Sequence, residues 1–220
     1  MTARDWVISE YRKDGRVITP LGDHGIVVSR KGRPDAVAYC CEYATTTTVT
    51  AQVVARALLE LPTTKMIMVF LSRQLVTPDA YDLARERGVC IDTFGGFTTA
   101  VDDYDDISRY QHREEQYLRR RMAATRAVST MLRKGHRAWW LERVNGLRPL
   151  TIITDDKYET TDLEVTAALD QYPALVPDAF VNTNPSTSGF SGRVLATTEN
   201  ADVRLFTLTE FLTTIRQPWT

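Results

Sequence analysis

The chain has 220 residues, of which 43% are hydrophobic and 25% are charged, and this ordinary globular composition excludes disorder on a large scale. The length allows one large domain or two small ones, each with a buried core. The formal net charge is −1, so the molecule as a whole does not attract nucleic acid.

Other features indicate the compartment. No apolar run reaches the roughly eighteen residues of a membrane-spanning helix, and the N-terminus lacks the apolar core of a signal peptide. We therefore expect a cytoplasmic protein that does not contact membranes. The odd number of cysteines, Cys40, Cys41 and Cys90, favours buried free thiols over a structural disulfide.

The first half of the sequence alternates strand patterns with helix patterns. In chain order, the expected elements are a helix over residues 3–13, strands over 16–19, 26–29 and 35–42, a helix through 53–61, a strand over 66–71, a helix from 77 to 88 and a strand over 89–92. Pro62 ends the second helix, and Pro78 lies in the first turn of the third. The alternation predicts an α/β unit with a mixed sheet.

The second half begins after an acidic segment, residues 101–106, which we predict to be the domain boundary. A long arginine-rich helix is predicted from 107 to 134, because the segment has one apolar face and contains neither Gly nor Pro. The further predicted elements are a strand over 150–154, a tight turn at Asp155-Asp156-Lys157, a helix over 162–172, a strand over 179–182, a helix near 190–198 and a last strand and helix.

An internal repeat relates the two halves. Residues 11–18 resemble 132–139, and residues 88–97 resemble 202–211. We therefore predict two tandem α/β units, 1–101 and 107–220, each a small mixed sheet flanked by helices and joined by the arginine-rich helix. The alternative is that two unrelated α/β units share generic patterning.

Several short segments of the first half carry a resemblance to a known family: residues 22–26, 36–43, 68–70, 77–80 and 84–92. In their order and spacing they resemble the Mrr-type restriction endonuclease domain, a branch of the PD-(D/E)xK nuclease superfamily. The resemblance covers about residues 3–98 and, more weakly, 125–215. It implies a restriction-endonuclease-like fold and DNA as partner. Nucleases of this fold often pair to reach both strands of DNA, so the resemblance also makes a homodimer one of the expected arrangements.

The resemblance locates the catalytic positions. The family places an Asp on one strand of a hairpin and a Glu or Gln, then a Lys two residues later, on the next strand. Carboxylates hold Mg²⁺, which polarises the phosphate, and the Lys positions or activates the attacking water. At the matching positions this chain has Val27, Tyr39 and Cys41, which cannot perform these roles. We therefore expect a catalytically degenerate nuclease without a cofactor.

Nearby carboxylates are candidates for a migrated catalytic site that would use Mg²⁺: Asp23, Asp35 and Glu42. Strand alternation points Glu42 away from the others unless a bulge intervenes. In the second unit, Asp155-Asp156-Lys157 is typical of a solvated hairpin turn. The three histidines lack the ligand spacing of a zinc site, so no metal site is predicted.

Basic charge is concentrated in residues 107–148, where eleven Arg and Lys residues accompany three Glu residues. Phosphate binding needs cations, and Arg can bind two oxygens at once. The candidate nucleic-acid contacts are Arg109, Arg113, Arg119, Arg120, Arg121, Arg126, Arg133 and Lys134. The alternative is a solvated face that pairs with Glu114 and Glu115 or docks on the acidic remainder of the chain.

Three functions are consistent with these features. The first is a DNA-binding or docking protein of a defence or DNA-processing system, which keeps a nuclease fold but does not cut. The second is a Mg-dependent endodeoxyribonuclease with the migrated site. The third is a structural or interaction protein that binds a protein partner and no nucleic acid.

Overall fold

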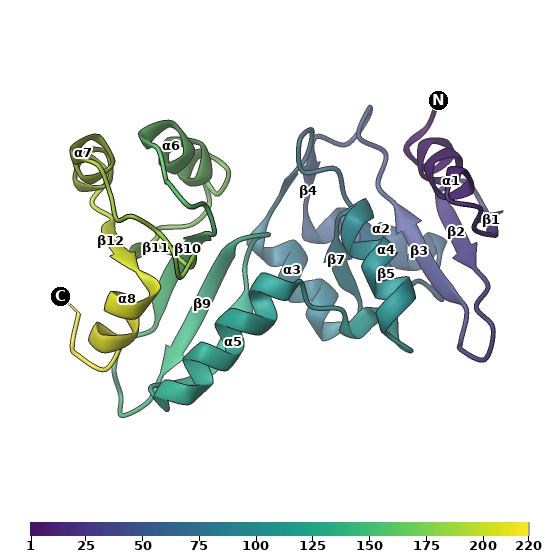
Figure 1. Ribbon diagram of the computed structural model, residues 1–220. Coiled ribbons are helices and arrows are strands. Elements are labelled where there is room, and N and C mark those ends of the chain that lie inside the picture. Colours follow the sequence, from purple (N-terminus) through teal and green to yellow (C-terminus); the bar gives the residue numbers. More distant parts are fainter. Residues whose placement is uncertain (220) are drawn as a thin grey trace. The chain divides into compact units, whose positions relative to one another are not determined.

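The computed structural model describes residues 1–219, which form two compact units that divide between Gln111 and His112. In Figure 1 each unit contains a sheet with helices packed on it. The predicted α/β class, with mixed sheets flanked by helices, is confirmed. No helix within residues 1–219 combines the length and the apolar character that crossing a membrane requires.

The first unit has a mixed five-stranded sheet. Its elements in chain order are α1 Ala3–Lys13, β1 Ile18–Leu21, β2 Gly25–Val28, β3 Ala36–Cys40, β4 Thr48–Val49, α2 Ala51–Glu60, β5 Met66–Met68, β6 Leu75–Val76, α3 Pro78–Glu86, β7 Cys90–Asp92, α4 Phe94–Asp103 and the short 3₁₀ helix η1 Ile107–Arg109. The sheet order is β1-β2-β3-β5-β7. The first three strands are antiparallel, and β3, β5 and β7 are parallel.

Helix α1 begins at a cap that the sequence supplies. The Thr2 hydroxyl accepts from the Asp5 N–H at 3.1 Å, and the Asp5 carboxylate accepts from the Thr2 N–H at 3.4 Å. Two backbone donors that a helix start leaves unpaired are thereby satisfied. Val7 and Tyr11, one turn apart, are fully buried, so α1 lies on the sheet by one face.

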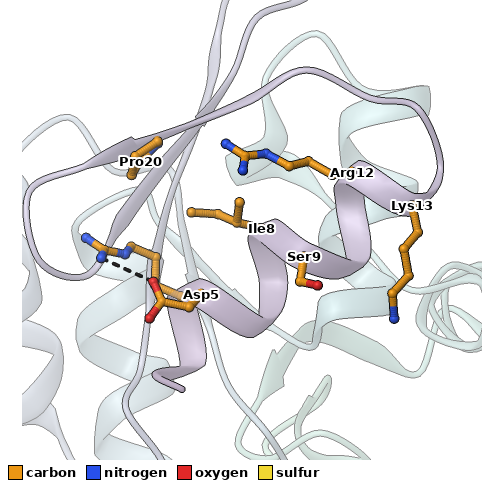
Figure 2. Close-up of a pocket in the computed structure, with 7 residues that line it drawn as sticks. Asp5, Ile8, Ser9, Arg12, Lys13 and Pro20 are labelled. Atoms are coloured by element: carbon orange, nitrogen blue, oxygen red, sulfur yellow. Dashed lines mark hydrogen bonds and ion pairs between the residues drawn. The ribbon is translucent and has the colours of Figure 1, made fainter.

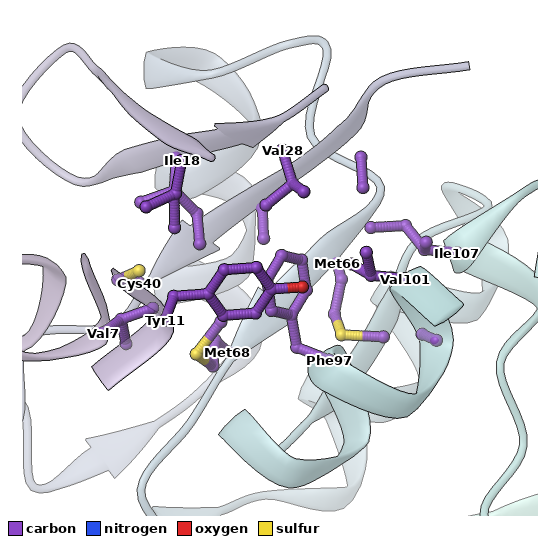
Figure 3. Close-up of a cluster of buried hydrophobic side chains, with 14 of the residues drawn as sticks. Val7, Tyr11, Ile18, Val28, Cys40, Met66, Met68, Phe97, Val101 and Ile107 are labelled. Carbon is purple, nitrogen blue, oxygen red and sulfur yellow. The ribbon is translucent and has the colours of Figure 1, made fainter. Parts of the chain in front are cut away.

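Strand β3 contributes to two separate cores. Ala36, Ala38 and Cys40 belong to the cluster beneath α1 and α4, which Figure 3 shows with Phe97 at its centre. Tyr39 and Cys41 belong to the cluster beneath α2 and α3. Successive side chains of a strand point to opposite faces of the sheet, and each large buried side chain stabilises the fold by about 1.5–3 kcal/mol.

The second unit repeats this arrangement. Its elements are α5 Arg113–Thr125, β8 Val128–Arg133, β9 Ala138–Arg143, β10 Leu150–Asp155, α6 Asp162–Asp170, β11 Ala179–Asn182, α7 Gly192–Asn200, β12 Arg204–Thr207 and α8 Leu208–Thr214. The sheet order is β8-β9-β10-β11-β12, again with antiparallel pairing first and parallel pairing last. Helices α5 and α8 cover one face and α6 and α7 the other.

The repeat is closest at the carboxyl ends of the units. Gly88 before β7 and Asp202 before β12, 114 positions apart in the sequence, both have positive φ, 65° and 54°. Thr93, which follows β7, and Thr207, the last residue of β12, cap α4 and α8 with their hydroxyls. Both units therefore contain the same succession of last strand, cap and helix, which in the first unit is followed by η1.

The predicted helix from 107 to 134 is wrong, and so is its role as a connector. That segment forms η1, α5 and strand β8. Arg126 ends α5 in the left-handed conformation, with φ 56°, and the following β-branched residues pair with β9. An Arg in the left-handed region carries no sequence signal, since Gly is the usual residue there.

Three further predictions need correction. The acidic segment is not a connector, because residues 101–103 belong to α4. Residues 132 and 133 lie in β8 rather than at a helix end, so the counterpart of α1 is α5. Asp155-Asp156-Lys157 is not a hairpin turn, because Asp155 is the buried last residue of β10 and α6 follows.

Candidate functional site

The positions that the resemblance to the Mrr-type domain matches to catalytic groups are buried or half-buried in the first unit. Val27 on β2 is half-buried, and Tyr39 and Cys41 lie in the core beneath α2 and α3. The Tyr39 hydroxyl donates to Glu60 at 2.9 Å, and its ring stacks on His24 with 5.2 Å between ring centroids. Burial raises the pKa of Tyr39, and it raises the pKa of Cys41 to about 12. Both side chains are therefore neutral at physiological pH.

The structure does not bring the three candidate carboxylates of this unit together. Gly25 pairs with Tyr39 and Val28 with Ala36, so Asp23 and Asp35 lie at opposite ends of the β2–β3 pair. Six residues of strand separate these ends, about 20 Å at 3.3 Å per residue.

Glu42 has a structural role. Its carboxylate accepts from the Ala3 N–H at 2.8 Å and from the Ala44 N–H at 3.1 Å. Ala3 is the first residue of α1, so Glu42 stabilises the positive end of that helix. The residues at this place in the first unit do not fit the Mg²⁺ that the resemblance implies.

The corresponding end of the second sheet holds a charged cluster, here called the Arg137 cluster: Glu114, Arg137, Asp155 and Asp156. Asp155 ends β10, Asp156 follows it, and Glu114 lies in the first turn of α5. The Arg137 guanidinium lies 3.2 Å from Glu114, 3.0 Å from Asp155 and 2.8 Å from Asp156. One cation is thus shared by three carboxylates.

Two of these three carboxylates are largely buried. The side chains of Glu114 and Asp155 are 9% and 11% exposed, against 47% for Asp156. Burial raises the pKa of Glu114, and the charge of Arg137 offsets part of that rise. Burial also raises the pKa of Asp155, offset by a hydrogen bond from Thr160 and by Arg137. The charge of Arg137 therefore favours the ionised form of both groups and opposes the effect of burial.

Neutral side chains complete the cluster and hold the loop that follows β10. Thr183 donates to Glu114 at 3.2 Å, and Thr160 donates to Asp155 at 3.1 Å. The Asn182 amide donates to the Lys157 carbonyl at 2.9 Å and to Thr160 at 2.7 Å. The carboxyl ends of β10 and β11 are thus joined by buried hydrogen bonds.

The Arg137 cluster does not fit a divalent ion either, because its oxygens already accept from a guanidinium and two hydroxyls. Within residues 1–219, no three His, Cys, Asp or Glu side chains are grouped as metal ligands. Sequence reasoning missed Glu114, Arg137 and Asn182 as members of one site. The available signal was a polar residue at the end of each apolar strand, Asp155 after 150–154 and Asn182 after 179–181.

The predicted nucleic-acid contacts divide into two groups. Arg119 donates to Glu115 and to the Met131 carbonyl, both at 2.8 Å, and Arg121 donates to the Tyr117 hydroxyl at 2.8 Å. Arg133 donates to the Gly135 carbonyl and contacts His136, and Lys134 is half-buried. The other group is exposed to solvent and consists of Arg109, Arg113, Arg120 and Arg126. The side chain of Arg109 is 84% exposed.

A cavity of about 670 Å³ lies beside the Arg137 cluster, and we call it the α5 cavity. Its lining residues are His112, Arg113, Glu114, Gln116, Tyr117 and Arg120 from the start of α5, and Asp156, Thr183, Asn184 and Pro185 from the strand ends. Two of the exposed arginines therefore share it with two members of the Arg137 cluster.

The first unit has a groove of about 630 Å³ between α1 and β1. In Figure 2, Ile8 and Arg12 point from α1 toward Pro20, whereas Arg4 is paired with Asp5. Arg4 also donates to the Gly22 carbonyl. The groove is thus less basic than its composition suggests.

Models of protein families, curated proteins and solved structures were compared with the chain, and none of them matches it.

Proposed function

We propose that this protein binds DNA through a nuclease-like fold without hydrolysing it, as a binding or docking component of a defence or DNA-processing system. The observation that carries the proposal is the Arg137 cluster, in which the guanidinium of Arg137 pairs with carboxylates of the kind that hold the metal ion in a nuclease. The first unit supports it, because Val27, Tyr39 and Cys41 supply no ligand for Mg²⁺.

The DNA-binding part rests on the exposed arginines of the second unit. Arg113, Arg120 and Arg126 lie on or just after α5, and all three residues are exposed. The net charge of the chain is −1, so attraction must come from this local concentration of cations. Contacts with phosphates are insensitive to sequence, and their strength falls with salt.

A gel assay with plasmid, short duplex and single-stranded DNA, with and without Mg²⁺ or Mn²⁺, tests both parts. We expect salt-sensitive binding and intact DNA under all conditions. Arg113→Glu with Arg120→Glu should weaken binding at least tenfold, whereas Arg193→Glu, an exposed change on α7, should have a much smaller effect. Metal-dependent cleavage, or no binding at low salt, would overturn the proposal.

A protein partner is the second candidate. Helices α6 and α7 pack on the same face of the second sheet, and they leave Leu163 76% and Leu195 45% exposed. Docking surfaces are contiguous exposed apolar areas, and a partner at this face would cover both leucines. In that case, Leu163→Glu should abolish partner binding while the Arg113→Glu and Arg120→Glu changes leave it intact.

A further inference from the structure

We propose that the α5 cavity receives one unstacked nucleotide of a single-stranded nucleic acid, with its base against Tyr117 and the phosphates on its two sides at Arg113 and Arg120. This inference rests on the proposed function and specifies the kind of DNA that the second unit binds. It is carried by the combination of a cavity, a fixed aromatic ring and two exposed cations in one place.

The cavity is built by one face of a helix. Arg113, Gln116, Tyr117 and Arg120 are spaced by three or four residues along α5, and residues at this spacing share a helix face. The opposite wall comes from the ends of β10 and β11. A volume of about 670 Å³ lies within the range of small-molecule sites.

Tyr117 is the aromatic wall. Its ring is half-buried and packs on the apolar core beneath α5, and its hydroxyl accepts from Arg121 at 2.8 Å. The guanidinium carbons of Arg120 and Arg121 lie 5.8 and 5.6 Å from the ring centroid. A base that stacks on this ring replaces a guanidinium on its exposed face, and any base can do so because every base has a π-face.

The cations lie on the same wall. Arg113 and Arg120 are two helical turns apart, about 10 Å along the axis, and both are exposed. They flank Tyr117 in the sequence, so a phosphate on either side of a stacked base is within reach of a guanidinium. Across the cavity, Asp156 supplies a carboxylate that can accept from the amino group of a base.

This geometry favours a single strand over a duplex. A paired base is covered on both faces by its neighbours, so contact with Tyr117 would require the base to leave the stack, at a cost of a few kcal/mol. A single-stranded base has already left it. Duplex DNA can still contact the exposed arginines through its phosphates.

The test uses the full chain and fluorescein-labelled DNA, a single-stranded 12-mer and the duplex of the same sequence, with binding measured by anisotropy at low salt. We expect tighter binding of the single strand. Tyr117→Ala should weaken that binding about tenfold and leave duplex binding unchanged. Tyr117→Phe, which keeps the ring, should bind like the wild type, as should Tyr158→Ala, an exposed Tyr that does not line the cavity.

Several results would overturn the inference. Single-strand binding that is unchanged in Tyr117→Ala would do so, as would an equal loss in Tyr117→Phe, which would assign the effect to the hydroxyl group. Melting curves of both variants separate loss of stacking from loss of fold. If both DNAs bind equally and independently of Tyr117, the nucleotide site is refuted and the proposed function is supported. If neither DNA binds, the nucleotide site and the proposed function are both refuted.

Discussion

Replacing Arg137 by Met tests whether the three carboxylates depend on a single cation. Met keeps most of the aliphatic length of the side chain and removes the charge. The change leaves Glu114 and Asp155 buried without their cation, while Asp156 can turn to solvent because it is 47% exposed. The loss of stability should therefore come almost entirely from the two buried groups.

The magnitude follows from their burial. Removing one partner of a buried ion pair costs about 3–5 kcal/mol. The Arg137 side chain is 29% exposed, so water reaches part of the site and the lower end, about 3 kcal/mol, applies near neutral pH. With a urea m-value of about 2 kcal/mol/M, the unfolding midpoint falls by about 1.5 M.

The loss should also depend on pH, and the sign follows from the two carboxylates. Burial raises the pKa values of Glu114 and Asp155, and without Arg137 these values rise further. Their folded forms then bind protons more tightly than the unfolded chain does, so stability falls as pH rises through the ordinary carboxylate range and above it. The difference between variant and wild type should therefore be small at pH 5 and largest at pH 8.

Urea unfolding followed by tryptophan fluorescence measures this loss, because Trp139, Trp140 and Trp219 all lie in the second unit. Arg193→Met, an exposed change on α7, is the control and should stay within about 0.5 kcal/mol of the wild type. Adding Glu114→Gln to Arg137→Met should restore part of the stability. A loss below 1 kcal/mol at pH 8, or an equal loss at pH 5, would refute the electrostatic reasoning.

Other predictions concern the first unit. Glu42→Ala removes the acceptor of the Ala3 N–H and should cost about 1 kcal/mol in urea unfolding; an unchanged midpoint would contradict its capping role. Burial raises the pKa of the Cys40 and Cys41 thiols to about 12, so at pH 8 both should resist a thiol reagent until the protein is denatured; rapid native labelling would show that they are accessible. Gly88→Ala, at φ 65°, should cost about 1 kcal/mol, and an unaltered melting temperature would argue against backbone strain there.

The sequence was sufficient to predict most of the fold because the elements have local signals. The range of α1 was predicted to the residue, helped by its regular apolar spacing. Strand β11 was also predicted with its observed bounds, 179–182, because a short apolar run between turn signals is typical of a buried strand. The bounds of most other predicted elements differ by a few residues, whereas α4, β4 and β6 were not predicted.

The failures have a common cause, which is tertiary pairing. Residues 128–133 have an apolar spacing that fits either a helix face or a strand, and pairing with β9 decides the outcome. The same holds for the Arg137 cluster. Glu114 and Asp155 are 41 positions apart in the sequence, and only the meeting of α5 with the end of β10 makes them neighbours, which no local pattern encodes.

The two units carry different side chains where the third strand of each sheet ends. The first unit has the buried thiols Cys40 and Cys41 there, whereas the second has Asp155 and Asp156 held by a guanidinium. A buried ion network is often no more stable than well-packed apolar side chains of similar volume. Stability alone therefore does not explain the Arg137 cluster. The proposed nucleotide site gives a reason, since Glu114 and Asp156 line the α5 cavity and fixed charges there would orient a bound nucleotide.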